Sequence, residues 1–234
     1  MTYVIQPPAV AAVPTTDGRS FPVHRIYCVG RNYAEHAVEM GHSGREPPFF
    51  FMKPADAVLP VADGQVGRMP YPPMTSNLHH EIELVVALGV GGRDVPVERA
   101  AELIWGYAIG LDMTRRDLQN EMKKQGRAWS IAKGFDASAP IGPVHPKSST
   151  GELTAGSISL DVNGQRRQTG DLKDLIWSIS ETIAALSRAW TLAPGDLIFT
   201  GTPAGVGAVV AGDKLSGSID GLGTLQLQIV PAAT

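Results

Sequence analysis

The stretch His79-His-Glu-Ile-Glu-Leu-Val-Val86 places two acidic residues inside an apolar run with the alternation of a β-strand. Because side chains alternate across a strand, Glu81 and Glu83 project from the same face, and Ile82, Leu84 and Val86 from the other. On a surface strand this pair would simply face water. Inside an apolar strand, mutual repulsion and lost hydration of the carboxylates are costly without a bound cation. The stretch therefore favours a strand that carries metal ligands.

A second apolar strand is predicted at Trp105-Gly-Tyr-Ala-Ile-Gly-Leu111, followed directly by Asp112. We expect it to neighbour the strand over 81–88 in one sheet, so that Asp112 supplies a third oxygen ligand. Three carboxylates and waters suit Mg²⁺ or Mn²⁺ better than Zn²⁺, which prefers nitrogen and sulfur. The two strands together predict a magnesium or manganese site.

The composition favours a mixed α+β, β-rich fold. Of 234 residues, 43% are hydrophobic and 18% charged, which is ordinary globular usage. The 26 glycines and 18 prolines favour many short strands and turns over long helices. We expect an N-terminal surface arm over residues 1–22 and a single domain over residues 23–234.

Charge and cysteine usage limit the partners. A net charge of -3 provides no basic field for nucleic acid. The opening residues lack the basic start of a signal peptide and are broken by prolines, so neither a signal peptide nor a membrane span is expected. The single cysteine, Cys28, lies in a predicted strand and is expected to be a packed thiol. We place the protein in the cytoplasm, without nucleic acid or membrane partners.

The rest of the chain alternates short strands with a few helices. Helices are predicted over 34–40, 97–103 and 114–124, and a further one follows Ser178-Ile-Ser-Glu181, which has the spacing of a capping box. The segment 64–78 is rich in turn formers and is expected to form loops. Strands are predicted over 25–29, 49–52, 57–60, 158–162, 197–200, 214–219 and 224–230.

Six motifs in order resemble the fumarylacetoacetate hydrolase superfamily. They are Gly30-Arg-Asn-Tyr-Ala-Glu-His36, Phe51-Met-Lys-Pro54, His80-Glu-Ile-Glu83, Gly110-Leu-Asp-Met113, Lys133-Gly-Phe-Asp136 and Thr200-Gly-Thr-Pro203. The resemblance runs from about Arg25 to Val230 and is closest to the fumarylpyruvate and acylpyruvate hydrolase branch. It implies a catalytic domain built as a twisted mixed β-roll with short flanking helices, a metal at the mouth of the roll, and a homodimer.

The resemblance also implies roles for individual residues. Glu81, Glu83 and Asp112 fall on the family's metal ligands, in agreement with the strand pattern. His36 and Glu39 fall on a catalytic dyad, in which Glu39 orients the imidazole that takes a proton from water. Lys133 falls on a lysine near the metal. The remaining matches lie at substrate-binding positions: Arg31, Lys53, Arg116, Gln119 and Thr202.

The function implied is metal-dependent hydrolysis of the carbon–carbon bond of an acylpyruvate, with fumarylpyruvate cleaved to fumarate and pyruvate in aromatic catabolism of the gentisate type. Arg116 or Arg127 could pair with the distal carboxylate of that substrate. Decarboxylation of oxaloacetate and isomerisation of a hydroxy-dienedioate need the same metal and stay open as alternatives. A metal-stabilised binding or scaffold protein is the non-enzymatic alternative, but it would have no need for His36, Glu39 and Lys133 together.

Overall fold

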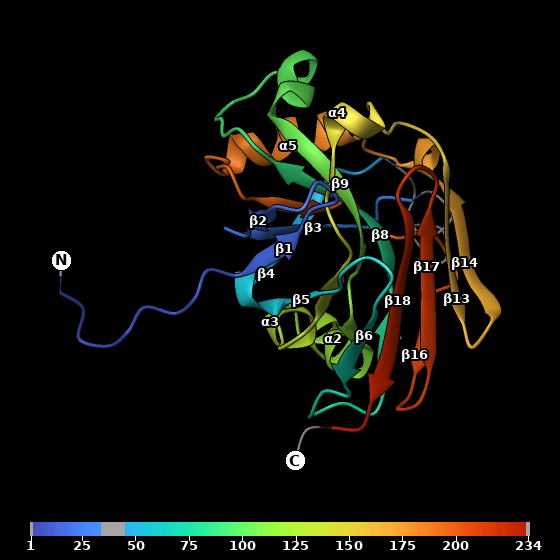
Figure 1. The fold of residues 1–234 in the computed structure, drawn as a ribbon. Coiled ribbons are helices and arrows are strands. Elements are labelled where there is room, and N and C mark those ends of the chain that lie inside the picture. The colour runs from blue at the N-terminus through green and yellow to red at the C-terminus, as the bar shows by residue number, and fades with distance from the viewer. Residues whose placement is uncertain (1, 34–44, 233–234) are drawn as a thin grey trace.

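Two central strands position the acidic residues. Glu83 lies within one strand, Glu81 comes directly before it, and Asp112 comes directly after the other strand. β8 (Ile82–Leu88) pairs antiparallel with β9 (Ile104–Leu111), and every residue of β8 is buried. The computed structural model describes residues 2–33 and 45–232, and Figure 1 shows this pair running through the middle of the molecule. Burial on both faces explains the nearly continuous apolar run of β8, in which only Glu83 is polar.

The larger sheet extends from this pair in both directions. Within the described residues its order is β4-β3-β15-β8-β9-β11-β5, and β12 also pairs with β9. The parallel pairing of β15 with β3 joins segments that lie far apart in the sequence. The remaining strands of this sheet are β3 (Ile26–Gly30), β4 (Phe49–Lys53), β5 (Val58–Pro60), β11 (Ala139–Ile141), β12 (His145–Pro146) and β15 (Leu197–Phe199).

A second sheet covers one face of β8 and β9 (Figure 1). Its order in the described part of the chain is β14-β13-β17-β18-β6. Ile82 and Leu84 of β8 share a hydrophobic cluster with Leu160, Leu215 and Leu227 of this sheet. Its strands are β6 (Val66–Pro70), β13 (Ser157–Val162), β14 (Gln165–Asp171), β17 (Lys214–Ile219) and β18 (Gly223–Val230).

The opposite face of β8 is covered by part of residues 1–22, which we expected to form an N-terminal surface arm. β1 (Ala12–Pro14) and β2 (Ser20–Pro22) form a hairpin whose Val13 and Phe21 pack with Val85. Residues 12–22 therefore belong to the folded body, because their alternating apolar side chains find a place in its core. Residues 2–10 are exposed and run away from that body in Figure 1.

Short helices lie at the ends of the sheets (Figure 1). The capping box at Ser178 and Glu181 opens α5, as predicted. The helix expected over 97–103 is instead a 3₁₀ segment, η2. The elements are α2 (Arg116–Lys124), α3 (Ser130–Lys133), α4 (Lys147–Thr150), α5 (Ile179–Ala189), η1 (Ala55–Ala57), η2 (Val97–Leu103) and η3 (Leu172–Asp174).

A small third sheet corrects two further expectations. β10 (Thr114–Arg115) and β16 (Gly207–Val209) both pair with β7 (Leu78–His80). Residues 114 and 115 are therefore strand rather than the start of a helix, and the segment 64–78, expected to form loops, contains β6 and the first residue of β7. The helix predicted over 34–40 lies outside the described residues. Among the helices of the described chain, none has the length and apolarity needed to span a bilayer.

Candidate metal centre and substrate site

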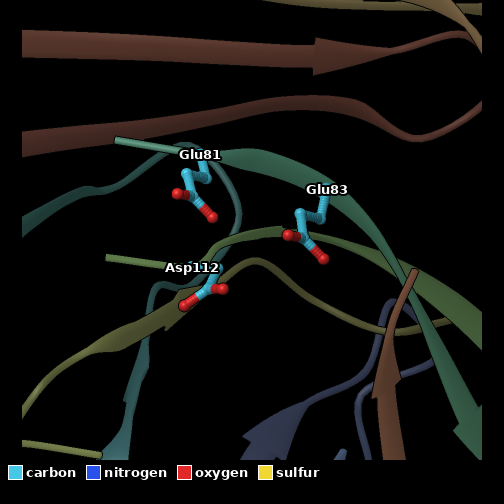
Figure 2. A group of neighbouring side chains, drawn as sticks. All are labelled: Glu81, Glu83 and Asp112. Carbon is cyan, nitrogen blue, oxygen red and sulfur yellow. The ribbon is translucent and has the colours of Figure 1, made fainter. Parts of the chain in front are cut away.

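Three carboxylates meet where β8 and β9 lie side by side. Glu83 pairs with Gly110 in the register of the two strands, and the Asp112 amide donates to the Glu81 carbonyl at 2.8 Å. One oxygen from each carboxylate lies within 4.8 Å of the others, and all three residues are buried, with exposed fractions of 6%, 2% and 1% for Glu81, Glu83 and Asp112. Figure 2 shows the three side chains gathered together. The structure thus brings together the three residues expected to bind metal.

Buried cations balance two of these carboxylates. Lys133 Nζ lies 2.8 Å from Glu81 Oε2 and 2.6 Å from Asp112 Oδ2, and Arg116 also pairs with Glu81. Burial opposes the charge on Lys133, but the attraction of Asp112 and Glu81 outweighs burial and raises the pKa of Lys133. Burial likewise opposes ionisation of Glu81, yet Lys133 and Arg116 hold the pKa of Glu81 well below its usual range. The ion pair between Lys133 and Glu81 therefore favours the charged form of both side chains.

Glu83 has a different environment. It accepts a hydrogen bond of 2.7 Å from the Gly201 amide, and it forms no ion pair with any other described residue. Burial, and then repulsion from Asp112 and Glu81, raise the pKa of Glu83 well above its usual range. The backbone here is tightly packed, because Gly201 has a φ of 103° and a Cβ at that position would lie 2.7 Å from Asn32 Cβ. Glu83 is thus held in place without a cationic side chain to neutralise it.

The donor set fits a hard divalent cation. Its ligand atoms are carboxylate oxygens, which Mg²⁺ and Mn²⁺ prefer. Among the described residues, Asp112 Oδ1 is buried and accepts no hydrogen bond, although Lys53 Nζ lies 2.9 Å away. A divalent ion held by these oxygens would relieve the repulsion that acts on Glu83. Glu81, Glu83 and Asp112 are the residues that would hold it.

The expected substrate-binding residues occupy two different places. Arg31, Arg116, Gln119, Thr202 and Lys133 line a cavity of about 30 Å³ together with the three carboxylates. Within this wall, Arg116 donates to both Glu81 and Gln119.

Lys53 does not border this cavity. It is 1% exposed, and its Nζ donates to the carbonyls of Met113 and Lys133 behind Asp112. Its position therefore supports Asp112 and Lys133 from behind. His36 and Glu39, the predicted dyad, lie outside the described residues.

The cavity around the carboxylates is also stabilised by a residue that the sequence analysis did not identify. Gln168 on β14 accepts from the Ile82 amide at 3.1 Å, bonds His80 Nδ1 at 2.8 Å and donates to Thr202 Oγ1 at 2.8 Å. It is fully buried and so ties the second sheet to the start of β8. No motif marks Gln168, because a polar residue in a polar strand has no periodic signal. The Asn163-Gly164 dipeptide before it is a hairpin signal that could have located β14.

The site combines three carboxylates that can bind a divalent cation with a buried lysine, Lys133, at one end of a curled sheet. These features are typical of a metal-dependent catalytic domain. Residues 25–230 match the family described as fumarylacetoacetate (FAA) hydrolase C-terminal. The chain belongs to the fumarylacetoacetate hydrolase family. This membership confirms the resemblance carried by the six motifs.

Individual relatives narrow the branch. A fumarylpyruvate hydrolase of Ralstonia sp is 45% identical over 187 residues, covering 80% of this chain and 95% of the relative. The mitochondrial oxaloacetate tautomerase FAHD1 of Rattus norvegicus is 43% identical over 204 residues, covering 87% and 90%. The crystal structure of fumarylpyruvate hydrolase from Pseudomonas aeruginosa in complex with Mn²⁺ and pyruvate is 55% identical, with a TM-score of 0.97 over 98% of this chain and 100% of that one. These matches are consistent with a hydrolase-type enzyme.

Proposed function

We propose that this chain hydrolyses acylpyruvates and that fumarylpyruvate, cleaved to fumarate and pyruvate, is its substrate. The observation that carries the proposal is the buried cluster of Glu81, Glu83 and Asp112. The cavity that contains this cluster is also lined by side chains that can donate hydrogen bonds. Similarity to two fumarylpyruvate hydrolases supports this choice of substrate. We further propose Mg²⁺ or Mn²⁺ as the cofactor, a homodimer as the assembly, residues 23–234 as the catalytic domain and the cytoplasm as the location.

The reaction adds water to the C4 carbonyl, breaks the bond between C3 and C4, and returns a proton to C3. A bound divalent cation would supply a positive charge that stabilises the enolate of the departing pyruvate. Lys133 carries a charged ammonium at this site and stabilises negative oxygen as the C4 centre becomes tetrahedral. Arg116 and Gln119 donate hydrogen bonds that orient the 2-oxo acid. His36, aligned by Glu39, removes the proton from the attacking water.

Oxaloacetate chemistry is the second candidate, because a relative named as an oxaloacetate tautomerase matches most of the chain. Tautomerisation and decarboxylation both use a stabilised enolate, but neither needs an attacking water. Hydroxy-dienedioate isomerisation also lacks that step. The attacking water separates hydrolysis from all three reactions. The proposed dyad separates hydrolysis from decarboxylation alone, because tautomerisation and isomerisation also need a base to move a proton. A binding or scaffold protein would turn over none of the substrates.

The test follows fumarylpyruvate, acetylpyruvate and oxaloacetate by nuclear magnetic resonance with the Mn²⁺-loaded protein. We expect fumarylpyruvate to be cleaved fastest. His36→Ala should lower that rate by about 10²–10⁴-fold, while decarboxylation of oxaloacetate falls much less because it needs no attacking water. Equal losses on both substrates would contradict the role of His36 in activating water. Turnover of oxaloacetate alone would replace hydrolysis by the second candidate.

A further inference from the structure

Two cavities meet beside the carboxylates. The inner cavity, about 30 Å³, contains the metal-binding carboxylates, and an outer cavity of about 380 Å³ is lined in part by Phe49 and Arg127. Arg31, Phe51 and Trp129 line both cavities. These three shared residues form the junction between the two spaces, and a ligand that occupied both spaces would contact them.

The volumes of the two cavities indicate which part of a ligand each could hold. About 10–15 Å³ is needed for one water, whereas cavities that hold small organic ligands measure about 300–1,000 Å³. The inner space therefore accommodates a cation with the oxygens that contact it, but not a whole acylpyruvate. The acyl arm of such a substrate extends beyond the inner space, and the outer cavity is an adjoining space large enough to hold it.

The walls of the outer cavity suit a flat arm. The rings of Phe51 and Trp129 lie 5.8 Å apart at an interplanar angle of 57°, and Phe49 meets Trp129 edge-on at 5.0 Å. Aromatic faces of this kind pack well against a planar conjugated chain. A fumaroyl group is planar and conjugated, whereas the acetyl group of acetylpyruvate fills little of this space.

Positive charge collects in the same place. Within the described residues, Arg31 Nε is buried without a hydrogen-bond partner, and the side chain of Arg127 makes neither a hydrogen bond nor an ion pair. Arg31 also adopts a φ of 60°, which is uncommon outside glycine and is typical of functional positions. Partial burial, followed by repulsion from Arg31 and Arg116, lowers the pKa of Lys123 on α2.

Arg116 is engaged elsewhere, because it pairs with Glu81 and donates to Gln119 inside the inner cavity. That commitment leaves Arg127 as the better partner for a carboxylate in the outer cavity. Guanidinium groups bind carboxylates in a bidentate way, so a charged end of the acyl arm would satisfy Arg127 there.

We infer that Arg127, with Arg31 at the junction, binds the distal carboxylate of a dicarboxylic acylpyruvate whose flat arm lies against Phe51 and Trp129. The inference rests on the proposed function and deepens it, because it assigns the preference for fumarylpyruvate over acetylpyruvate to one side chain. Arg127 is then a specificity residue that takes no part in bond cleavage.

Kinetics with two substrates test the assignment. Arg127→Gln is expected to lower kcat/KM for fumarylpyruvate by about 10- to 100-fold, the range for losing one hydrogen bond between charged groups, and to leave acetylpyruvate within about twofold of wild type. For Arg127→Lys, kcat/KM for fumarylpyruvate should lie between the values for wild type and Arg127→Gln. The matched control is Arg68→Gln, an exposed arginine on β6 of the second sheet, which should change neither substrate. Equal losses on both substrates, or no loss on fumarylpyruvate, would overturn the assignment.

A binding measurement keeps the subsite separate from the reaction. Calorimetry with the Mn²⁺-loaded protein should show tighter binding of 2-oxoheptanedioate than of 2-oxoheptanoate, which has the same chain length without the distal carboxylate. Arg127→Gln should remove that difference. Equal binding of the two acids by wild type would overturn the subsite. A preference for the dicarboxylate without cleavage of either acylpyruvate would leave the subsite standing and refute the proposed hydrolysis.

Discussion

Replacing Lys133 by methionine removes the cation shared by two buried carboxylates. The ammonium is 2% exposed and lies within 2.8 Å of Glu81 and 2.6 Å of Asp112. Methionine keeps much of the apolar stem, so the main loss is the charge. Breaking a buried ion pair from one side costs about 3–5 kcal/mol.

Proton uptake limits this cost. A carboxylate that has lost its partner can bind a proton, and each pH unit above an ordinary Asp pKa makes that uptake about 1.4 kcal/mol more costly. The destabilisation by Lys133→Met is therefore limited to about 4 kcal/mol at pH 7 and falls to about 1.5 kcal/mol at pH 5. The sign follows from Glu81. Lys133 and Arg116 hold the pKa of Glu81 below its usual range, so the stability contributed by this ion pair is lost as pH falls.

Urea unfolding in a chelating buffer measures this free energy at both pH values. Lys124→Met is the matched control, because Lys124 is an exposed lysine on α2, and its stability should change by less than about 0.5 kcal/mol. Adding Mn²⁺ should stabilise Lys133→Met more than wild type, since the cation replaces the missing positive charge. A pH-independent loss below about 1 kcal/mol, together with equal stabilisation by Mn²⁺, would refute the reasoning.

Three further predictions concern Glu83, Ser178 and His145. Glu83→Gln should keep the fold, since the Gly201 amide can donate to an amide oxygen, but lose Mn²⁺ binding in calorimetry; unchanged affinity would remove Glu83 from the ligand set. Ser178→Ala breaks the capping box of α5 and should lower the free energy of unfolding by about 1 kcal/mol in urea titrations, so an unaltered midpoint would contradict that role. Burial lowers the pKa of His145, so folding is disfavoured as pH falls below about 6.5, the ordinary histidine pKa, and His145→Gln should reduce that loss; identical pH profiles of unfolding would show that His145 does not contribute.

The centre of this fold could be predicted from the sequence because its pattern is local. Alternation around Glu81 and Glu83, and an apolar run ending at Asp112, are enough to place the carboxylates on neighbouring strands. The capping box at Ser178 has the same property, since its partner lies three residues away.

Other features depend on contacts that sequence spacing does not reveal. Gln168 reaches the site from a separate sheet, and Lys53 faces away from the cavity although its motif places it close to Asp112. The hairpin formed by β1 and β2 was missed because three-residue strands give too short an alternation. The cavity at Arg127 forms only when β4 and the loop before α3 come together. Tertiary packing decides all of these features.

The most direct test of the central claim is a titration of chelator-treated protein with Mn²⁺ while fumarylpyruvate turnover is followed by nuclear magnetic resonance. We predict no cleavage without the cation, and release of fumarate and pyruvate in equal amounts as the cation is added. Activity should saturate at a single bound ion per chain, and Glu83→Gln should abolish that binding. Undiminished cleavage after complete removal of the metal, or no fumarate at saturating Mn²⁺, would contradict it.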